Sequence, residues 1–237
     1  MWSHQTHLML SEHEIGRRLA EVNDRISAAA RRSPHAPGAI CLVVASKTQP
    51  PDAILAAYRA GARHFGENYV QEALAKRIRL QDFADLRWHL IGHLQTNKAR
   101  PAASMFDLIH SVDSKRLAQA LHKVHPLPPT RVLLEINLGG ETSKRGIPPG
   151  DAERLIAEIR DQVEVAGLMA IPPPAPRAEH SRRYFSRLRE MRDTLAARSG
   201  LRLAELSMGM TDDFEVAIEE GATIVRVGRA VFGERPP

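Results

Sequence analysis

Eight short apolar segments recur along the chain, and their regular alternation with amphipathic stretches restricts the folds open to it. The apolar segments cover residues 39–46, 62–66, 86–92, 105–111, 130–137, 163–170, 202–207 and 222–227. Helical periodicity fills the intervals near residues 51–60, 67–80, 96–103, 114–124, 150–161, 178–199 and 211–220. Strands that alternate with helices in this way predict an α/β fold, a single parallel (β/α)8 TIM barrel. A doubly wound open sheet is the competing arrangement.

An additional helix is predicted ahead of the first strand. Residues 11–14 have the pattern of a capping box, and an amphipathic pattern continues from there to about Arg32. The segment GRAVFGERPP after the last strand is too short for a full eighth helix, so the N-terminal helix could cover that position. Because no linker or low-complexity tract interrupts the chain, we expect a flexible tail over residues 1–10 and one barrel domain over residues 11–237.

Composition and charge favour a globular protein over a membrane, secreted or nucleic-acid-binding one. A hydrophobic content of 43% with 26% charged residues is typical of a globular domain, and no apolar run approaches the ~18 residues of a membrane span. The N-terminus lacks an apolar signal core and Cys41 is the only cysteine, so we expect a cytoplasmic protein. The net charge is +5, but the arginines of residues 177–198 are mixed with acidic residues, which favours a solvated helix over a nucleic-acid groove.

Two of the predicted loops are typical of a phosphate site. Ser207, Gly209 and Thr211 lie between the seventh strand and the next helix, and Gly228 and Arg229 follow the eighth strand. Glycine allows the backbone to approach a ligand closely, and N–H groups at helix starts bind anions. In a parallel barrel the active site lies where the strands end, and the loops after strands seven and eight commonly hold phosphate.

Two charged side chains occupy positions where burial is expected. Lys47 follows the apolar run LVVAS, and Arg226 lies within ATIVRVG. Arg226 either pairs with a carboxylate of a neighbouring strand, such as Glu205 or Glu135, or contacts a ligand beside the phosphate loops. A lysine that is desolvated at the barrel rim can attack an aldehyde. Lysine, phosphate site and arginine together fit pyridoxal phosphate (PLP) held as a Schiff base, whereas a class-I-aldolase-like sugar-phosphate enzyme has less need of the arginine.

Several motifs occur in order between about residues 11 and 235. They are VVASKTQP, HFGENYVQEALAK, WHLIGHLQTNK, IHSVDS, INLGGETSKRGI, GLMAIPP and LSMGMTDDFEVAIEEGATIVRVGRAVFGER. Together they resemble the YggS/PROSC family of pyridoxal phosphate homeostasis proteins, which is similar to the fold-type III barrel domain of alanine racemase standing alone. The resemblance implies a PLP-binding protein that affects vitamin B6 balance without an established reaction.

The resemblance also implies roles for individual residues. It implies Lys47 as the Schiff-base lysine, Asn68 near the ring, Arg226 at the pyridine nitrogen, and Ser207, Gly228 and the backbone of residue 229 as phosphate contacts. Arg229 stands where many relatives have threonine, so a hydroxyl contact is lost, although a guanidinium could replace it. His93 stands where many relatives have proline. His89 and His93 are separated by roughly 13 Å on a strand, so we expect no metal there, with His89 in the core and His93 at the rim.

The same residues bear on catalysis. An arginine at the ring nitrogen makes the ring a weaker electron sink, and racemisation needs an acid and a base on opposite faces of the substrate. In alanine racemases a tyrosine from an additional domain of a partner chain supplies one of them, and this chain has no length for that domain. Tyr58 and Tyr184 are expected to pack within helices, whereas Tyr69 could approach the site. We therefore expect a PLP carrier without turnover, with a PLP-dependent racemase or lyase and an interaction module as alternatives.

Lys144, in the motif ETSKRGI, could capture the cofactor during loading or release, or it could be a solvated loop charge. Delivery of PLP implies transient contact with apo PLP-dependent enzymes. No stretch reads as a subunit interface, so we expect a monomer without nucleic-acid or membrane partners.

Overall fold

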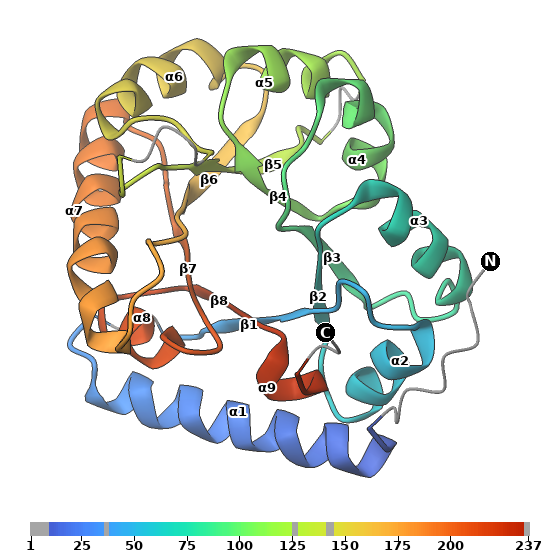
Figure 1. The fold of residues 1–237 in the computed structure, drawn as a ribbon. Coiled ribbons are helices and arrows are strands. Elements are labelled where there is room, and N and C mark those ends of the chain that lie inside the picture. The colour runs from blue at the N-terminus through green and yellow to red at the C-terminus, as the bar shows by residue number, and fades with distance from the viewer. Residues whose placement is uncertain (1–9, 36–37, 125–127, 141–144, 235–237) are drawn as a thin grey trace.

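Eight parallel strands close into a barrel in the computed structural model, which describes residues 10–35, 38–124, 128–140 and 145–234 (Figure 1). Each strand pairs in parallel with the next, and β8 closes the barrel against β1. The strands are β1 (Cys41–Ala45), β2 (His64–Glu67), β3 (Arg87–Leu90), β4 (Leu108–Val112), β5 (Arg131–Glu135), β6 (Glu164–Met169), β7 (Glu205–Met210) and β8 (Ile224–Val227). The closed order confirms the predicted barrel and excludes the doubly wound sheet, which would leave two free edges.

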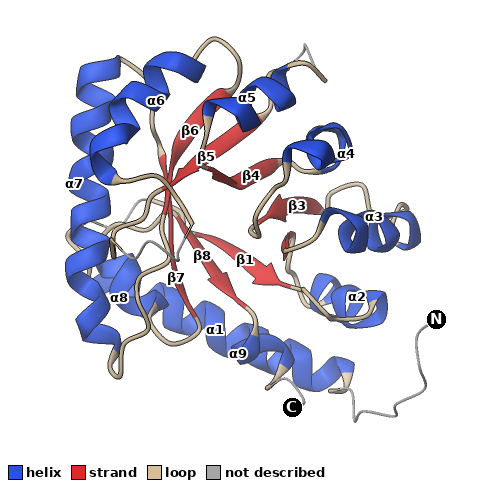
Figure 2. Ribbon diagram, turned by 45° about the horizontal axis from the view of Figure 1, so that its top comes forward, coloured by secondary structure: helices blue, strands red, loops and turns tan. Residues whose placement is uncertain are grey.

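Helices follow the strands and surround the barrel (Figure 2). They are α2 (Pro51–Arg59), α3 (Val70–Arg79), α4 (Ala99–Met105), α5 (Lys115–His122), α6 (Ala152–Ile159), α7 (Arg182–Ser199), α8 (Phe214–Glu219) and α9 (Arg229–Phe232). Short 3-10 turns, η1 (Thr96–Lys98), η2 (Pro149–Asp151) and η3 (Ala178–Ser181), precede α4, α6 and α7. No helix in this described part of the chain is long and apolar enough to span a membrane.

Helix α1 (Glu12–Arg32) takes the place of an eighth outer helix, as predicted. The Ser11 side chain accepts a hydrogen bond from the Glu14 N–H at 3.1 Å, which caps the helix start. One buried stripe recurs every three or four residues and consists of Ile15, Leu19, Val22, Ile26 and Ala29. Through this stripe α1 packs beside α2, α8 and α9 (Figures 1 and 2), so it covers the gap that the short α9 leaves.

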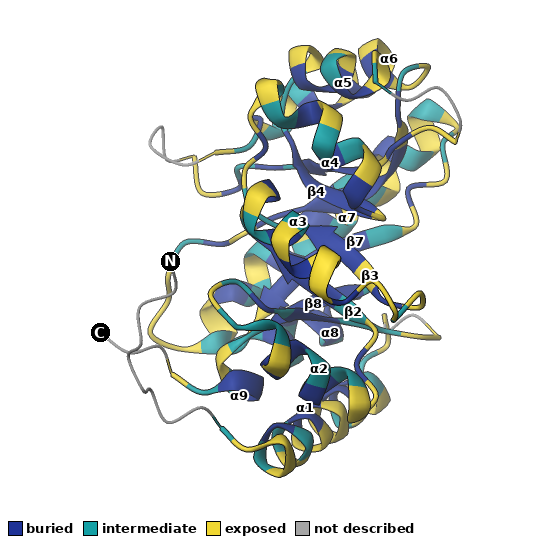
Figure 3. Ribbon diagram, turned by 90° about the vertical axis from the view of Figure 1, so that its right-hand side faces the viewer, coloured by how far each residue is buried: buried dark blue, intermediate teal, exposed yellow. Residues whose placement is uncertain are grey.

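The strands are mostly buried, whereas the outer helices carry many exposed residues (Figure 3), and the buried apolar side chains form two clusters. Alternate strand residues point outward and pack against the helices, which explains why the strands read as continuous apolar runs. The inner cluster is much smaller and consists of Val43, Leu108, Leu133, Ala166, Met169 and Ile224. The remaining interior positions carry polar side chains, which include His89, His110, Ser207 and Arg226.

Strand β7 differs most from its prediction. It runs from Glu205 to Met210, whereas the sequence predicts a strand over residues 202–207. The register between β7 and β8 shifts between Ser207 and Met210, and Gly209 has a φ of 88°. The strand thus continues through residues that read as a loop, while Ser207, which pairs with Met169 and Ile224 before the irregularity, is buried inside the barrel.

Candidate functional site

A cavity of about 350 Å³ opens where the strands end, on the side of β1, β2 and β8. Lys47, Asn68, Arg226, Gly228 and Arg229 line it, so the structure brings together most of the predicted site residues. The other lining residues are Ala45, Gln49, Ile91, Ile171, Met210, Thr211, Asp212, Phe232 and Gly233. Ser207 and Gly209 are not among them. A larger hollow of about 580 Å³ lies at the opposite end of β5 to β7 and contains none of the predicted residues.

Lys47 sits in a tight turn directly after β1. The next residue, Thr48, has a φ of 68°, a left-handed conformation that is unusual for a β-branched residue. The Thr48 N–H donates to Glu72 Oε1 at 2.8 Å, and the Gln49 N–H donates to the Ser46 carbonyl at 2.9 Å. The backbone on both sides of Lys47 is therefore fixed by hydrogen bonds.

A buried network of ion pairs and hydrogen bonds contacts the backbone of the turn that contains Lys47. Lys76, whose side chain is 2% exposed, donates to the Ser46 carbonyl at 2.8 Å, to Glu67 Oε1 at 2.8 Å and to Glu72 Oε1 at 2.7 Å. The Ser46 hydroxyl donates to Glu67 Oε1 at 2.5 Å. Burial raises the pKa of Glu67, and the Lys76 ammonium opposes that rise. We infer that this network positions Lys47.

This network is not evident from the strand pattern, although the sequence contains one signal of it. Lys76 continues the buried stripe of α3, three residues after Ala73. A lysine on the apolar stripe of a helix requires a buried partner, because an unpaired ammonium is costly in the interior. The pattern could have revealed Lys76, but not that its partners flank Lys47.

Arg226 is the innermost charge of the cavity. Its guanidinium donates to Ser207 Oγ at 2.6 Å and to the Ala170 carbonyl at 3.1 Å. These acceptors are neutral, so the ion pair with Glu135 or Glu205 that the sequence left open does not form. Burial lowers the pKa of Arg226 to about 10, which still leaves the guanidinium charged at neutral pH.

Ser207 lies beneath Arg226 rather than in the cavity wall. Its hydroxyl is hydrogen-bonded to Arg226 and, at 2.8 Å, to Nδ1 of His110. His110 Nε2 lies 2.9 Å from His89 Nδ1, and His89 Nε2 lies 2.9 Å from His64 Nδ1. Burial lowers the pKa of all three histidines, that of His89 to about 3, so they are neutral. His89 is thus a hydrogen-bonded core residue, as predicted, and the phosphate contact of Ser207 stays a prediction.

The loops after β7 and β8 owe their shape to glycine. At Gly209 an added Cβ would lie 2.5 Å from the Ala217 Cβ, and the positive φ independently favours glycine. Gly209 therefore shapes the turn into α8, and its expected contact with a ligand stays a prediction. At Gly228 a Cβ would lie 3.1 Å from the Ala45 carbonyl oxygen, so glycine lets β8 end close against β1.

Arg229 and several other predicted residues lie at or near the opening of the cavity. The Arg229 guanidinium pairs with Asp212 and, at 3.2 Å, with Glu234, and it is 42% exposed. Thr211 also lines the cavity. Tyr69 is 65% exposed and contributes nothing to the cavity lining, and His93 is exposed at the rim as expected. Lys144 and residues 1–9 of the expected tail lie outside the described residues.

Comparisons with known proteins agree with this geometry. The family model of the alanine racemase N-terminal domain matches residues 18–236. The pyridoxal phosphate homeostasis protein of Pseudomonas aeruginosa is 44% identical over 225 residues, which cover 93% of this chain and 96% of that relative. The structure of PipY from Synechococcus elongatus with PLP bound is 40% identical, with a TM-score of 0.82, and the match covers 92% of this chain and 100% of that chain.

A more distant structure shows the common fold. The alanine racemase of Corynebacterium glutamicum is 19% identical with a TM-score of 0.69, and the match covers 93% of this chain but 62% of that one. The resemblance seen in the motifs is confirmed by the closer relatives. The chain therefore belongs to the alanine racemase N-terminal domain family and, within it, to the pyridoxal phosphate homeostasis proteins.

Proposed function

We propose that this protein binds PLP in the cavity beside Lys47 and takes part in PLP homeostasis by holding and delivering it without turnover. The observation that carries the proposal is the single cavity that joins the Lys47 side chain, the buried Arg226 guanidinium and the Gly228–Arg229 backbone. The Pseudomonas relative is named for PLP homeostasis, and the PipY structure contains PLP, which supports the same ligand here.

The residues of the cavity suit this cofactor. Its volume of about 350 Å³ lies in the range of small-molecule sites. The Lys47 amine can condense with the aldehyde to a Schiff base, which forms one C=N bond and releases one water. The loops that contain Thr211 and Gly228 supply a hydroxyl and backbone N–H groups for a phosphate, since the first N–H groups of a helix have no partner within it.

Arg226 favours holding over catalysis. A guanidinium can only donate hydrogen bonds, so beside a ring nitrogen it favours the unprotonated form of that nitrogen. PLP supplies an electron sink for carbanions when bound, and that sink is weaker when the ring is unprotonated. The buried Arg226 side chain is held in place by hydrogen bonds to Ser207 and to the Ala170 carbonyl.

The described lining of the cavity contains no histidine, cysteine or tyrosine to act as a second acid or base. Asp212 lines the cavity but its carboxylate pairs with Arg229. Removal of a substrate proton would therefore fall to Lys47 alone, whereas racemisation needs groups on both faces. The chemistry supports a carrier, which would act as a cytoplasmic monomer and contact apo-enzymes transiently.

Visible absorption of the purified protein tests the binding. We expect an absorption band from lysine-bound PLP, which Lys47→Ala removes. Lys98→Ala is the matched control, because Lys98 lies near the same rim in a separate hollow with Asn68 and Tyr69. An unchanged band in Lys47→Ala would contradict the proposed attachment.

Transfer and turnover assays then separate a carrier from an enzyme. The loaded protein is expected to restore activity to an apo PLP-dependent enzyme. Incubation with a panel of amino acids is expected to leave their chirality unchanged and to release no keto acid. Racemisation or keto-acid release that depends on Lys47 would instead support a racemase or lyase. Lys144→Ala, compared in loading and release rates, tests whether that lysine assists the exchange.

A further inference from the structure

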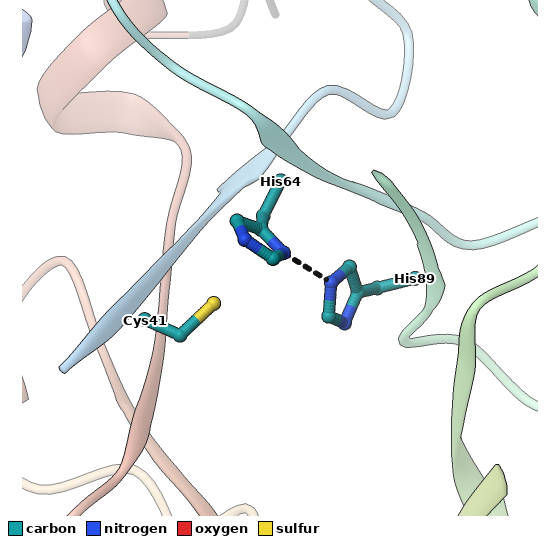
Figure 4. Close-up of side chains that lie close together, drawn as sticks. All are labelled: Cys41, His64 and His89. Atoms are coloured by element: carbon teal, nitrogen blue, oxygen red, sulfur yellow. Dashed lines mark hydrogen bonds between the residues drawn. The ribbon is translucent and has the colours of Figure 1, made fainter. Parts of the chain in front are cut away.

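A second cluster of chemically reactive side chains lies in the barrel interior, far along the strands from the cavity. Cys41 is the first residue of β1, His64 is the first residue of β2, and His89 lies on β3 (Figure 4). The Cys41 sulfur and one ring nitrogen from each histidine all lie within 4.8 Å of one another. The barrel brings them together because β1, β2 and β3 are neighbours in the sheet.

We propose that Cys41, His64 and His89 form a binding site for one thiolate-binding cation of the zinc type. Thiolate and imidazole are the ligands that zinc prefers, and three protein ligands leave a fourth position for water. The filled d shell of zinc imposes no preferred coordination geometry. The ion can therefore accept ligand positions that are set by the spacing of three strands. The proposal is independent of PLP, because none of the three residues lines the cavity.

The distance between the two histidines is close to that of a metal site. His64 Nδ1 and His89 Nε2 lie 2.9 Å apart and share one proton. Two nitrogen ligands about 2.0–2.1 Å from a tetrahedral ion lie about 3.3 Å apart, so zinc binding requires these nitrogens to separate by a few tenths of an ångström and the His89 proton to move from Nε2 to Nδ1. The Cys41 sulfur must approach within about 3.6 Å of each nitrogen, and it now lies within 4.8 Å of both.

A further histidine fixes the orientation of the His89 ring. His89 Nδ1 lies 2.9 Å from His110 Nε2, and His110 in turn is hydrogen-bonded to Ser207. Ligating histidines usually bind a hydrogen-bond partner through the ring nitrogen that does not face the metal. His110 therefore holds the His89 ring so that Nε2 faces Cys41 and His64.

The cluster is reachable from solvent, and the charges around it are mixed. Burial raises the pKa of the Cys41 thiol to about 12, so an arriving ion must displace the thiol proton. Carboxylates act on the cluster from the barrel's N-terminal side, Glu205 on Cys41 and Asp107 on His64, while Arg87 and Arg131 oppose them. Cys41 and His64 are half-buried rather than sealed in, which gives an ion a route from that side.

Titration of the full-length, tag-free protein with Zn²⁺, combined with zinc X-ray absorption, tests the site. We expect one tightly bound ion with one sulfur ligand at about 2.3 Å and two nitrogen ligands at about 2.0–2.1 Å. Cys41 is the only cysteine, so a short zinc–sulfur distance identifies it without any variant. A spectrum with nitrogen and oxygen ligands alone would overturn the proposal and assign the ion to surface histidines.

Substitutions of the proposed ligands provide a second test of the zinc site. Cys41→Ser and His64→Gln are expected to weaken Zn²⁺ binding by more than the roughly 10–100-fold that loss of an outer partner costs. His93→Gln, at an exposed histidine outside the cluster, and Lys47→Ala, which removes the proposed cofactor lysine, are expected to bind Zn²⁺ as the parent does. Equal affinity in Cys41→Ser and the parent would overturn the proposal.

Discussion

Replacing Lys76 with methionine tests how the turn at Lys47 is held. Methionine keeps the length and apolar stem of lysine but removes the ammonium that contacts the Ser46 carbonyl, Glu67 and Glu72. Glu67 is fully buried, and its Oε2 has no hydrogen-bond partner among the described residues. The variant therefore leaves a buried carboxylate with one remaining donor, the Ser46 hydroxyl.

We expect Lys76→Met to lower the free energy of unfolding by about 3–5 kcal/mol, the usual cost of removing one partner of a buried ion pair. The loss should depend on pH. Burial already raises the pKa of Glu67, and removal of the ammonium raises it further. A folded-state pKa above the unfolded value means that the folded state binds more protons, so stability falls as pH rises from the unfolded pKa through the folded one.

Denaturant unfolding at about pH 5 and about pH 8 measures this dependence, with the larger loss expected at the higher pH. Adding Glu67→Gln to Lys76→Met removes the buried charge and is expected to restore most of the stability lost at about pH 8. Lys123→Met, at an exposed lysine, is the control and should change stability by no more than about 0.5 kcal/mol. An equal loss at both pH values, or no rescue by Glu67→Gln, would refute the buried-carboxylate explanation.

Three further substitutions test separate features. Gly209→Ala is expected to destabilise the fold by more than about 1 kcal/mol, because its φ is 88° and the new Cβ would lie 2.5 Å from that of Ala217; denaturant unfolding measures it. Arg229→Thr should change stability by less than about 1 kcal/mol, because its ion pairs are exposed, while the rate of PLP release reports any gain from the hydroxyl. Ser11→Ala removes the cap of α1 and should cost about 1 kcal/mol in thermal or denaturant unfolding, whereas Ser11→Gly should cost only a few tenths.

The sequence predicts the barrel well because the pattern repeats with every unit. Each buried strand of a parallel barrel is covered on both faces, so it reads as a short apolar run bounded by turn residues. The cavity follows from the same assignment, because the ends of parallel strands meet at one rim. Lys47, Asn68 and Arg226 could therefore be placed together without coordinates.

The remaining features depend on contacts across strands, which periodicity does not contain. The distance between Cys41 and His64 is set by the pairing of β1 with β2, and the partners of Lys76 are set by how α3 lies on the barrel. Ser207 was expected at the end of the seventh strand as a phosphate contact, but β7 continues to Met210, and the Ser207 hydroxyl is bonded to Arg226 and His110 inside the barrel. Because β7 ends at Met210 and not at Ser207, Met210 lines the cavity and Ser207 does not.

The hydrogen-bonded series of Arg226, Ser207, His110, His89 and His64 makes a last prediction possible, because one direction of donation satisfies every member. Arg226 can only donate, so Ser207 accepts from it and has its own proton available for His110 Nδ1. A neutral imidazole has one donor, so His110 and then His89 donate through Nε2, toward His64. Zinc on His89 Nε2 would reverse the His110–His89 bond and the Ser207–His110 bond, whereas Arg226 would still donate to Ser207. Nitrogen NMR should therefore find Nε2-protonated His89 without zinc and Nδ1-protonated His89 with it; Nδ1 protonation in both states would refute this coupling.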